Sequence, residues 1–344
     1  MKILVLYSRL TGYWMACMQV DHQQAGNEYL VIRKNPSPEA PFQINPEKGI
    51  EILDGDGLSA QELTATAIAF QPDLLYVAGW ADKRYLETAL HFEKEGLPVI
   101  TGMDNQWLGN LKQRIAGVMS PILVKKYFTH IWIPGFPQHV FASKLGFSSE
   151  NILRGLYCAD DRLFKGISQS GYTKQITFVG RLVEHKGLKI LFDVINELIR
   201  ENKLALTVHI IGNGPLAGEI PKHDNIKHNA FVAPEALPGL LENAGFLILP
   251  SLYEAWGVVV HEAVLAGLPV ITTQQTGAAS EFVIHGHNGF IYGATDKEAL
   301  KKTLLEIQTL PEEKYLQMSR NSKKLAERIS LNTWSATLNS VVTN

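Results

Sequence analysis

The sequence has few of the features that mark a secreted, membrane-spanning or nucleic-acid-binding protein. Only two of its 344 residues are cysteines, too few for a disulfide framework or a cysteine-ligated zinc site. Its 32 basic and 34 acidic residues nearly cancel, whereas a nucleic-acid binder usually carries a basic excess. The first apolar run ends at Tyr7, so we expect a buried first strand there and not a signal peptide or a membrane span. These absences favour a cytoplasmic protein that binds no nucleic acid.

Length and the order of apolar runs predict an α/β protein of two domains. A chain of 344 residues exceeds the usual size of a single hydrophobic core. Apolar runs of strand length alternate with helical stretches, which indicates parallel sheets in Rossmann-like domains. We expect an N-terminal domain over residues 1–165 and a C-terminal domain over 166–330. A linker is predicted over 164–173, and a last helix over about 331–344.

The stretch 250–280 holds two acidic residues in a telling context, and it reads PSLYEAWGVVVHEAVLAGLPVITTQQTGAAS. The apolar run before it predicts a buried parallel strand, and a helix should begin near Gly257. Ligands bind outside the carboxyl ends of such strands. Glu254 would lie there and Glu262 on the helix, where an ionised carboxylate can accept hydrogen bonds from two vicinal hydroxyls. The plain alternative is two solvated surface glutamates.

A second pattern, GRLVEHKG, occupies residues 180–187 directly after a buried strand. Arg181 would lie at the carboxyl end of the strand and Lys186 near the start of the next helix. Two cations and the N–H groups of a helix N-terminus would then converge on one point and favour an anion. A surface charge pair is the alternative.

These residues resemble the GT4 family of retaining glycosyltransferases, also called glycosyl transferases group 1, which have the GT-B fold. EAWGVVVHE is similar to the family's E-x7-E motif and GRLVEHKG to its GRL-x3-KG signature. The resemblance spans nearly the whole chain and is densest over 176–290. It implies two Rossmann-like domains whose parallel sheets face a deep interdomain cleft. It further implies retaining transfer of a hexosyl group from a nucleoside diphosphate sugar to a hydroxyl of a glycan or lipid-linked glycan, as in polysaccharide biosynthesis.

The resemblance also assigns roles on the donor side, in the C-terminal domain. Arg181 and Lys186 would hold the diphosphate, whose negative charge grows as the glycosidic bond breaks, so fixed cations stabilise the transition state. Glu262 would bind the ribose hydroxyls, and Glu254 would contact the transferred sugar near its reacting carbon. Further donor contacts, mostly through the backbone, are expected from Gly12, Gly180, Gly212, Gly214, Val232, Gly257, Val258 and Val259.

The acceptor side, in the N-terminal domain, departs from the family pattern. Met103 stands where many members have a histidine that contacts the transferred sugar. Asp104 is then the polar candidate near the reaction, and Trp80 and Trp107 are candidates for acceptor binding. A helix-capping aspartate and a packing tryptophan are the structural alternative.

We expect no metal cofactor. Asp54-Gly55-Asp56 matches a metal-binding D-x-D pattern of a different glycosyltransferase fold, but the other features of that fold are absent from the sequence. We interpret it as a turn and helix cap before a helix over 59–70.

Residues 105–149 contain no aspartate or glutamate, and their basic residues are interleaved with apolar ones. The segment is a candidate amphipathic surface, and the resemblance implies contact with an anionic membrane or a lipid-diphosphate acceptor. The protein would then be peripheral at the inner face of a membrane. An ordinary solvated face is the alternative.

Other functions stay open at this point. A GT-B-fold sugar-nucleotide epimerase and a non-catalytic sugar-nucleotide-binding subunit share the fold, and an NAD-dependent oxidoreductase is more distant. The donor sugar, its base and the acceptor are not readable, because specificity lies in loops while the fold is shared.

Overall fold

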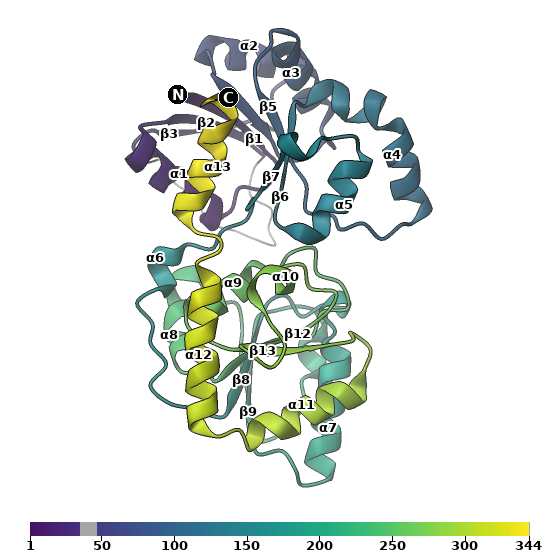
Figure 1. Ribbon diagram of the computed structural model, residues 1–344, viewed down its shortest axis with the longest axis vertical. Helices are drawn as coiled ribbons and strands as arrows, with labels where there is room; N and C mark the ends of the chain where they lie inside the picture. Colours follow the sequence, from purple (N-terminus) through teal and green to yellow (C-terminus); the bar gives the residue numbers. More distant parts are fainter. Residues whose placement is uncertain (35–46, 344) are drawn as a thin grey trace. The chain divides into compact units, whose positions relative to one another are not determined.

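The computed structural model describes residues 1–34 and 47–343, and the chain divides into two compact units. Unit 1 comprises Met1–Asp160 together with the chain from Ile329 onward, and unit 2 is Asp161–Arg328 (Figure 1). The division falls a few residues before the boundary expected from the sequence. The sequence also predicts a loop over residues 35–48, which are rich in proline and asparagine, and most of it lies outside the described residues.

Unit 1 is built on a seven-stranded parallel sheet with the strand order β3-β2-β1-β4-β5-β6-β7. Its strands are β1 (Lys2–Tyr7), β2 (Glu28–Arg33), β3 (Ile50–Asp54), β4 (Leu74–Val77), β5 (Val99–Gly102), β6 (His130–Ile133) and β7 (Ile152–Arg154). Its helices are α1 (Gly12–Ala25), α2 (Ala60–Phe70), α3 (Lys83–Lys94), α4 (Leu111–Leu123), α5 (Phe136–Lys144) and α13 (Leu331–Thr343).

Unit 2 is built on a six-stranded parallel sheet with the order β10-β9-β8-β11-β12-β13. Its strands are β8 (Gln175–Val179), β9 (Thr207–Ile211), β10 (Ile226–Asn229), β11 (Phe246–Leu249), β12 (Val270–Thr273) and β13 (Gly289–Tyr292). Its helices are α6 (Asp161–Phe164), α7 (Leu188–Arg200), α8 (Leu237–Glu242), α9 (Val258–Leu265), α10 (Ala279–Phe282), α11 (Lys297–Gln308) and α12 (Glu312–Ala326).

Each sheet is the buried centre of its unit, as the continuous apolar runs predict. All residues of β4, β11 and β12 are buried, which fits parallel strands covered on both faces. Helix α7 shows the complementary pattern, because its buried residues recur at helical spacing from Leu188 to Leu198. The prediction of two Rossmann-like units with parallel sheets is confirmed.

The predicted linker over 164–173 is wrong, because these residues pack into unit 2. Phe164 and Ile167 are buried. The Gln169 side chain donates to the carbonyl oxygen of Ala266, 3.1 Å away, just past the end of α9. The last carbonyls of a helix have no partner within it, so this polar segment has a structural use that composition does not reveal. Strand β7 was also not predicted, since only Ile152 of its three residues is buried.

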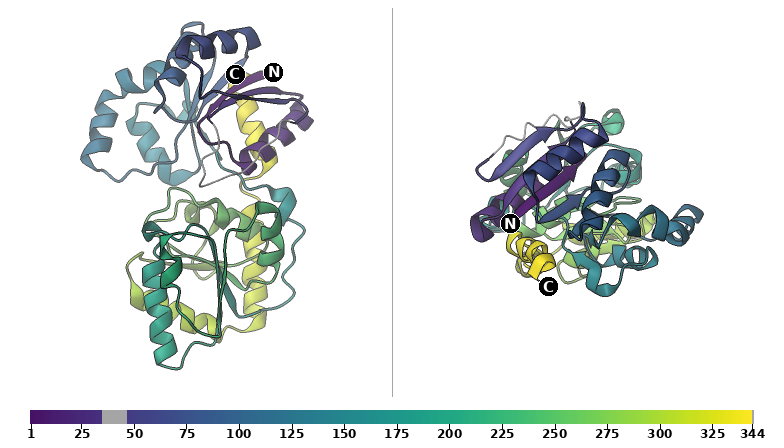
Figure 2. Two further views of the ribbon diagram at one scale, coloured as in Figure 1. Left: turned by 180° about the vertical axis from the view of Figure 1, so that it is seen from behind. Right: turned by 90° about the horizontal axis from the view of Figure 1, so that it is seen from above.

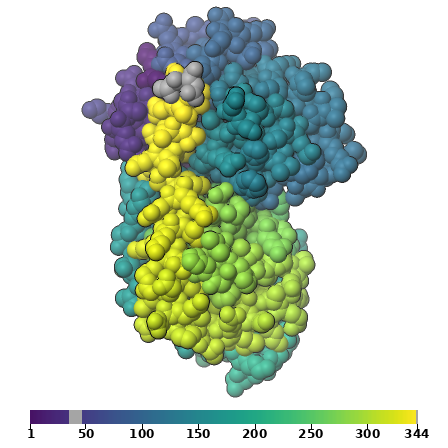
Figure 3. Space-filling view, viewed as in Figure 1, coloured from purple at the N-terminus to yellow at the C-terminus, as the bar shows by residue number. Residues whose placement is uncertain are grey.

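Helix α13 is fastened to unit 1 by a buried carboxylate on α1. Asp21 accepts hydrogen bonds from Ser335 Oγ at 2.5 Å and Asn339 Nδ2 at 2.7 Å, both on α13, and from the Tyr29 hydroxyl at 2.5 Å. A buried carboxylate is stable only when it is hydrogen-bonded in this way. The two helices lie side by side in Figures 1 and 2, and Figure 3 shows α13 at the surface of unit 1.

The Asp54-Gly55-Asp56 segment forms the predicted turn. The N–H of Asp56 donates to Asp54 Oδ1 at 2.9 Å. Ser59 then caps α2 in a reciprocal capping box with Glu62. Hence the interpretation as a turn before a capped helix is confirmed, while metal independence stays a prediction.

Candidate functional site

The loops at the carboxyl edge of the unit 2 sheet are locked together by glycines. Gly187, after β8, has φ of 70°, and a Cβ there would lie 1.9 Å from the carbonyl oxygen of Pro250 in the loop after β11. Gly212, after β9, would place a Cβ 2.0 Å from the carbonyl oxygen of Gly180. Since no other residue fits at such distances, three loops share one fixed geometry.

An ion pair lies among these loops. Lys186 Nζ donates to Glu254 Oε2, and the two side chains are only 14% and 16% exposed. The Ser251 hydroxyl also faces the same carboxylate oxygen, at 3.4 Å. The Lys186 side chain passes over Gly180, whose Cβ position lies 3.9 Å from Lys186 Cε. The two predicted charges are therefore together, but in this structure they neutralise each other.

Backbone contacts hold Glu254 in place from the other side. Its N–H donates to the carbonyl oxygen of Gln275 at 3.1 Å, and its carbonyl oxygen accepts from the N–H of Gly277 at 3.0 Å. Gly257, with φ of 94°, completes the bend, since a Cβ there would approach Glu254 Cγ to 3.1 Å. The carboxylate thus stands on a rigid loop before α9, as a preorganised site requires.

Arg181, which follows β8, is exposed. Burial lowers the pKa of the neighbouring His185. The charges of Lys186 and Arg181 lower this pKa further, and the charge of Glu254 raises it. A cationic environment of this kind favours an anionic ligand.

Glu262 lies in α9, just past the first turn of the helix, and is partly buried. Desolvation raises its pKa to about 7. The first-turn N–H groups of α9, including those of Val258 and Val259, have no acceptor within the helix. The helix start thus offers donors near Glu254, and Glu262 offers a carboxylate that changes charge near neutral pH.

The remaining predicted donor residues occupy two places. Gly214, with φ of 154°, lies in the turn after β9, and the N–H of Gly212 donates to the carbonyl oxygen of Asn229 at 2.9 Å, which joins β9 to β10. Val232 follows β10 a few residues later, so it lies at the same edge. Gly12 belongs to unit 1, where it begins α1, and its role stays a prediction.

On unit 1 the structure separates Met103 from Asp104. Met103 is buried in the core and is 3% exposed, so its side chain does not take the place of a polar contact. Asp104 instead accepts a hydrogen bond from the Tyr157 hydroxyl at 3.3 Å. Sequence reasoning missed Tyr157, because only the fold brings the end of β7 to the end of β5. Because β7 itself is not predicted from the sequence, no signal for Tyr157 was available there.

The two tryptophans have structural partners. Trp107 packs against Phe141, with ring centroids 5.6 Å apart, and Lys144 lies 5.0 Å above its ring. Trp80 is partly buried against the core of unit 1. The packing alternative accounts for both positions, and acceptor binding by either stays a prediction.

Comparisons with known proteins show similarity to glycosyltransferases. The family described as "Glycosyl transferases group 1" matches residues 161–325. An uncharacterised glycosyltransferase of Methanocaldococcus jannaschii is 30% identical over 44% of this chain and 43% of its own length. D-inositol 3-phosphate glycosyltransferase of Corynebacterium jeikeium is 32% identical over 39% of this chain and 36% of its own. The chain thus spans less than half the length of these curated relatives.

Solved structures extend the likeness to the whole chain. The Anabaena protein HepE, crystallised in complex with UDP, aligns with a TM-score of 0.76 at 17% identity and covers 100% of both chains. WaaG, a glycosyltransferase involved in lipopolysaccharide biosynthesis, aligns with a TM-score of 0.69 at 14% identity over 100% of both chains.

The chain therefore has the two-unit GT-B fold of glycosyltransferases. Its residues 161–325, which hold Arg181, Lys186, Glu254 and Glu262, match the model of the glycosyl transferases group 1 family. Within residues 1–34 and 47–343, every helix is too short or too polar to span a membrane.

Proposed function

We propose that the protein is a retaining, metal-independent glycosyltransferase of the GT4 type, which uses a nucleoside diphosphate sugar. The observation that carries the proposal is the Lys186–Glu254 pair beside Arg181, at the glycine-locked edge of unit 2. This edge belongs to the family-matched residues. HepE, of the same fold, has been crystallised with UDP and with UDP-glucose, which makes UDP the first nucleoside diphosphate to test.

The proposed chemistry follows from charges in a fixed place. A departing diphosphate gains negative charge as the glycosidic bond breaks, and Lys186 and Arg181 would stabilise that charge without a metal ion. When the diphosphate binds Lys186, the Glu254 carboxylate is released from the ion pair. It can then accept hydrogen bonds from hydroxyls of the transferred sugar. The acceptor hydroxyl attacks from the face that the diphosphate leaves, so a phosphate oxygen takes its proton. Glu262 binds the ribose.

Thermal shift against UDP, GDP and ADP tests this site, because a ligand that binds only the folded state raises the melting temperature. At least one diphosphate should stabilise the wild type, and Lys186→Ala should lose most of the shift. Lys189→Ala is the matched control, since Lys189 pairs with the exposed Glu184 a few residues away. Absence of any shift in the wild type would sink the proposal and revive an oxidoreductase.

The two related alternatives make different predictions about the free donor. An epimerase converts the sugar nucleotide without an acceptor, whereas a non-catalytic subunit binds it and leaves it unchanged. Chromatography of the donor after incubation with and without acceptors separates these outcomes from transfer.

We further propose that residues 105–149 contact an anionic membrane surface through α4. The helix packs inward with small residues: the Gly117 Cβ position lies 3.2 Å from the carbonyl oxygen of Lys144, and the buried Ser120 donates to that of Leu145. Its large apolar side chains point outward instead, and Val118 is 80% exposed. The exposed large apolar residues of α4 are Leu111, Ile115, Val118, Met119, Ile122 and Leu123, and the exposed Leu108 lies just before the helix.

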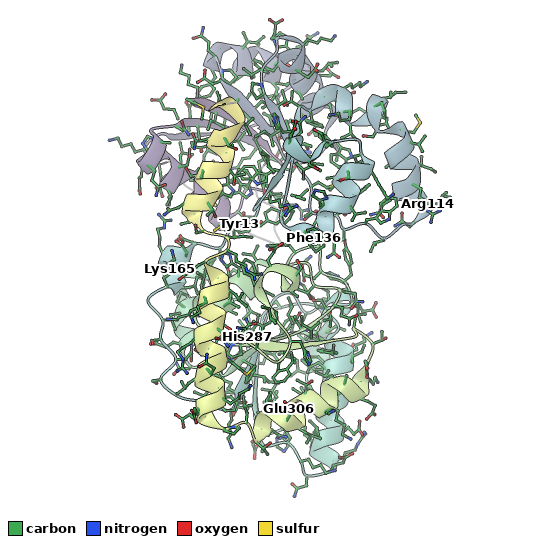
Figure 4. All side chains as sticks on the ribbon, in the orientation of Figure 1. Tyr13, Arg114, Phe136, Lys165, His287 and Glu306 are labelled. Carbon is green, nitrogen blue, oxygen red and sulfur yellow. The ribbon has the colours of Figure 1, made fainter. Side chains whose placement is uncertain are left out.

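Charge selects the partner of this face. Lys112 and Arg114 flank the apolar stripe on the same helix, and residues 105–149 contain no acidic residue. Helix α4 stands at the outer side of unit 1 in Figures 1 and 2, and Arg114 is marked there in Figure 4. An apolar stripe bordered by cations is typical of a helix that lies in the interface of an anionic bilayer.

Flotation with vesicles containing phosphatidylglycerol decides this point. The wild type should float at low salt, and an Ile115→Glu, Val118→Glu double variant should stay in solution. Ile68→Glu serves as control, because Ile68 is an exposed apolar residue on α2. Failure of the wild type to float, or self-association through α4 in place of lipid binding, would reject the membrane proposal.

A further inference from the structure

A group of tyrosines surrounds Asp104 at the carboxyl edge of the unit 1 sheet. Asp104 follows β5, Tyr157 follows β7, and Tyr13 lies in the first turn of α1, after β1. In a parallel sheet these strand ends share one edge. The Tyr157 hydroxyl donates to Asp104 Oδ2 at 3.3 Å, and the rings of Tyr13 and Tyr157 meet edge to face, with centroids 5.7 Å apart. Figure 4 marks Tyr13 at this edge.

Two buried tyrosines form the floor beneath this group. Tyr7 and Tyr76 stack with centroids 6.1 Å apart and are both buried. Burial raises the pKa of each far above its ordinary value, and the negative charge of Asp104 adds to the rise. The Tyr76 hydroxyl reaches the end of β5, where a Cβ on Gly102 would lie 2.1 Å from it. The packing of Tyr76 against Gly102 therefore holds the start of the loop that carries Asp104 in place.

The three residues around Asp104, unlike Tyr7 and Tyr76, are accessible to a ligand. Tyr13, Asp104 and Tyr157 are each only partly buried. Aromatic rings beside a carboxylate suit a pyranose, whose C–H face is apolar and whose hydroxyls are donors.

We propose that Tyr157 is a positioning residue which orients Asp104, and that Tyr13, Tyr157 and Asp104 together bind a pyranose of the acceptor. The inference rests on the proposed function, since it names the chemical class of the acceptor. The acceptor hydroxyl is held by a carboxylate that a phenol keeps in one orientation. The sugar ring lies against the two aromatic side chains.

The test uses the full-length protein with the donor chosen by thermal shift. Methyl pyranosides of glucose, galactose, mannose and N-acetylglucosamine are offered as acceptors, with glycerol as the non-sugar control. Release of nucleoside diphosphate should rise with at least one pyranoside and not with glycerol. Tyr157→Phe should lower kcat/KM for that pyranoside by roughly tenfold, as expected for loss of a hydrogen bond to a charged group, and leave diphosphate affinity unchanged.

Tyr172→Phe is the matched control. It removes a phenol that donates to the carbonyl oxygen of Ile307 at 3.0 Å in unit 2, and it should change neither quantity. If every pyranoside fails while diphosphate binds, or if Tyr157→Phe behaves like Tyr172→Phe, the acceptor inference is wrong and the donor site stands. If no diphosphate binds, the proposed function itself has failed.

Discussion

The edges proposed as binding sites in the two units are opposite in character. The edge of unit 2 is built from backbone: glycines at contact distance lock three loops, and an ion pair stands inside them. The edge of unit 1 is built from side chains, with tyrosine rings and one carboxylate on a buried aromatic floor. A phosphate is recognised by charge and N–H groups, which one fixed backbone can supply. A sugar is recognised by shape and hydroxyls, so its site has to vary from one protein to another.

Loss of a cation in unit 2 should have the largest effect. Arg181→Ala or Lys186→Ala should lower turnover by roughly 10²- to 10³-fold, the usual cost of removing a fixed stabiliser of transition-state charge. The assay is release of nucleoside diphosphate, with Lys189→Ala as control. Near wild-type turnover in either variant would remove the basis for assigning the donor to unit 2.

The glycine lock should be the next most sensitive feature. Gly187→Ala forces a Cβ against the carbonyl oxygen of Pro250 at positive φ, so it should cost roughly 2 kcal/mol or more of stability and weaken diphosphate binding. Gly218→Ala is the matched control, since its Cβ position is open. Urea denaturation measures both, and equal stability would show that the loops can separate at no cost.

Glu254→Gln should divide binding from chemistry. The variant removes the carboxylate that occupies Lys186, so diphosphate affinity should hold or rise while turnover falls. Calorimetric titration beside a turnover assay gives the two quantities. Parallel loss of both would mean that Glu254 is needed to build the site and has no separate role toward the sugar.

The smallest effect is expected from pH. The folded-state pKa of Glu262 is raised to about 7, above its ordinary value of 4.5. The stability it contributes in the neutral form is present below about pH 4.5 and is lost as pH rises through about 7. The ionised form is also the better acceptor for ribose hydroxyls, so diphosphate affinity should increase over that range.

Glu262→Gln should lack both trends, and comparison with it cancels the titration of the ligand's own phosphate. Melting temperatures from about pH 5 to about pH 8, with and without diphosphate, provide the measurement. Identical pH profiles for the two proteins would place Glu262 outside the site.

Sequence predicted unit 2 better than unit 1 for a physical reason. Buried parallel strands appear in the sequence as apolar runs, and the loops proposed to bind phosphate have glycines and cations at fixed spacing, so the sequence alone indicates both. The ion pair itself was not, because Lys186 and Glu254 are 68 residues apart and were assigned to different parts of the ligand. Their loops are brought together by the close approach of Gly187 to Pro250 and by the hydrogen bond that the Leu252 N–H donates to the carbonyl oxygen of His185 at 2.8 Å.

In unit 1 the informative contacts lie between residues without a shared pattern. Asp104 and Tyr157 are 53 residues apart, and neither belongs to a motif. The orientation of α4 could not be predicted from the sequence. Its inward side is made of small residues and its large apolar residues face outward, which is the reverse of the usual amphipathic helix. The packing of residues 164–173 depends on polar contacts such as that of Gln169, which composition cannot show.

The division of labour between the units is tested most directly by one binding measurement on two variants. Calorimetric titration of the stabilising nucleoside diphosphate into Lys186→Ala and Asp104→Asn compares the charged edge of unit 2 with the tyrosine-lined edge of unit 1. The account predicts that Lys186→Ala loses most of the affinity and that Asp104→Asn keeps the wild-type value. Equal loss in both variants, or loss in Asp104→Asn alone, would contradict it.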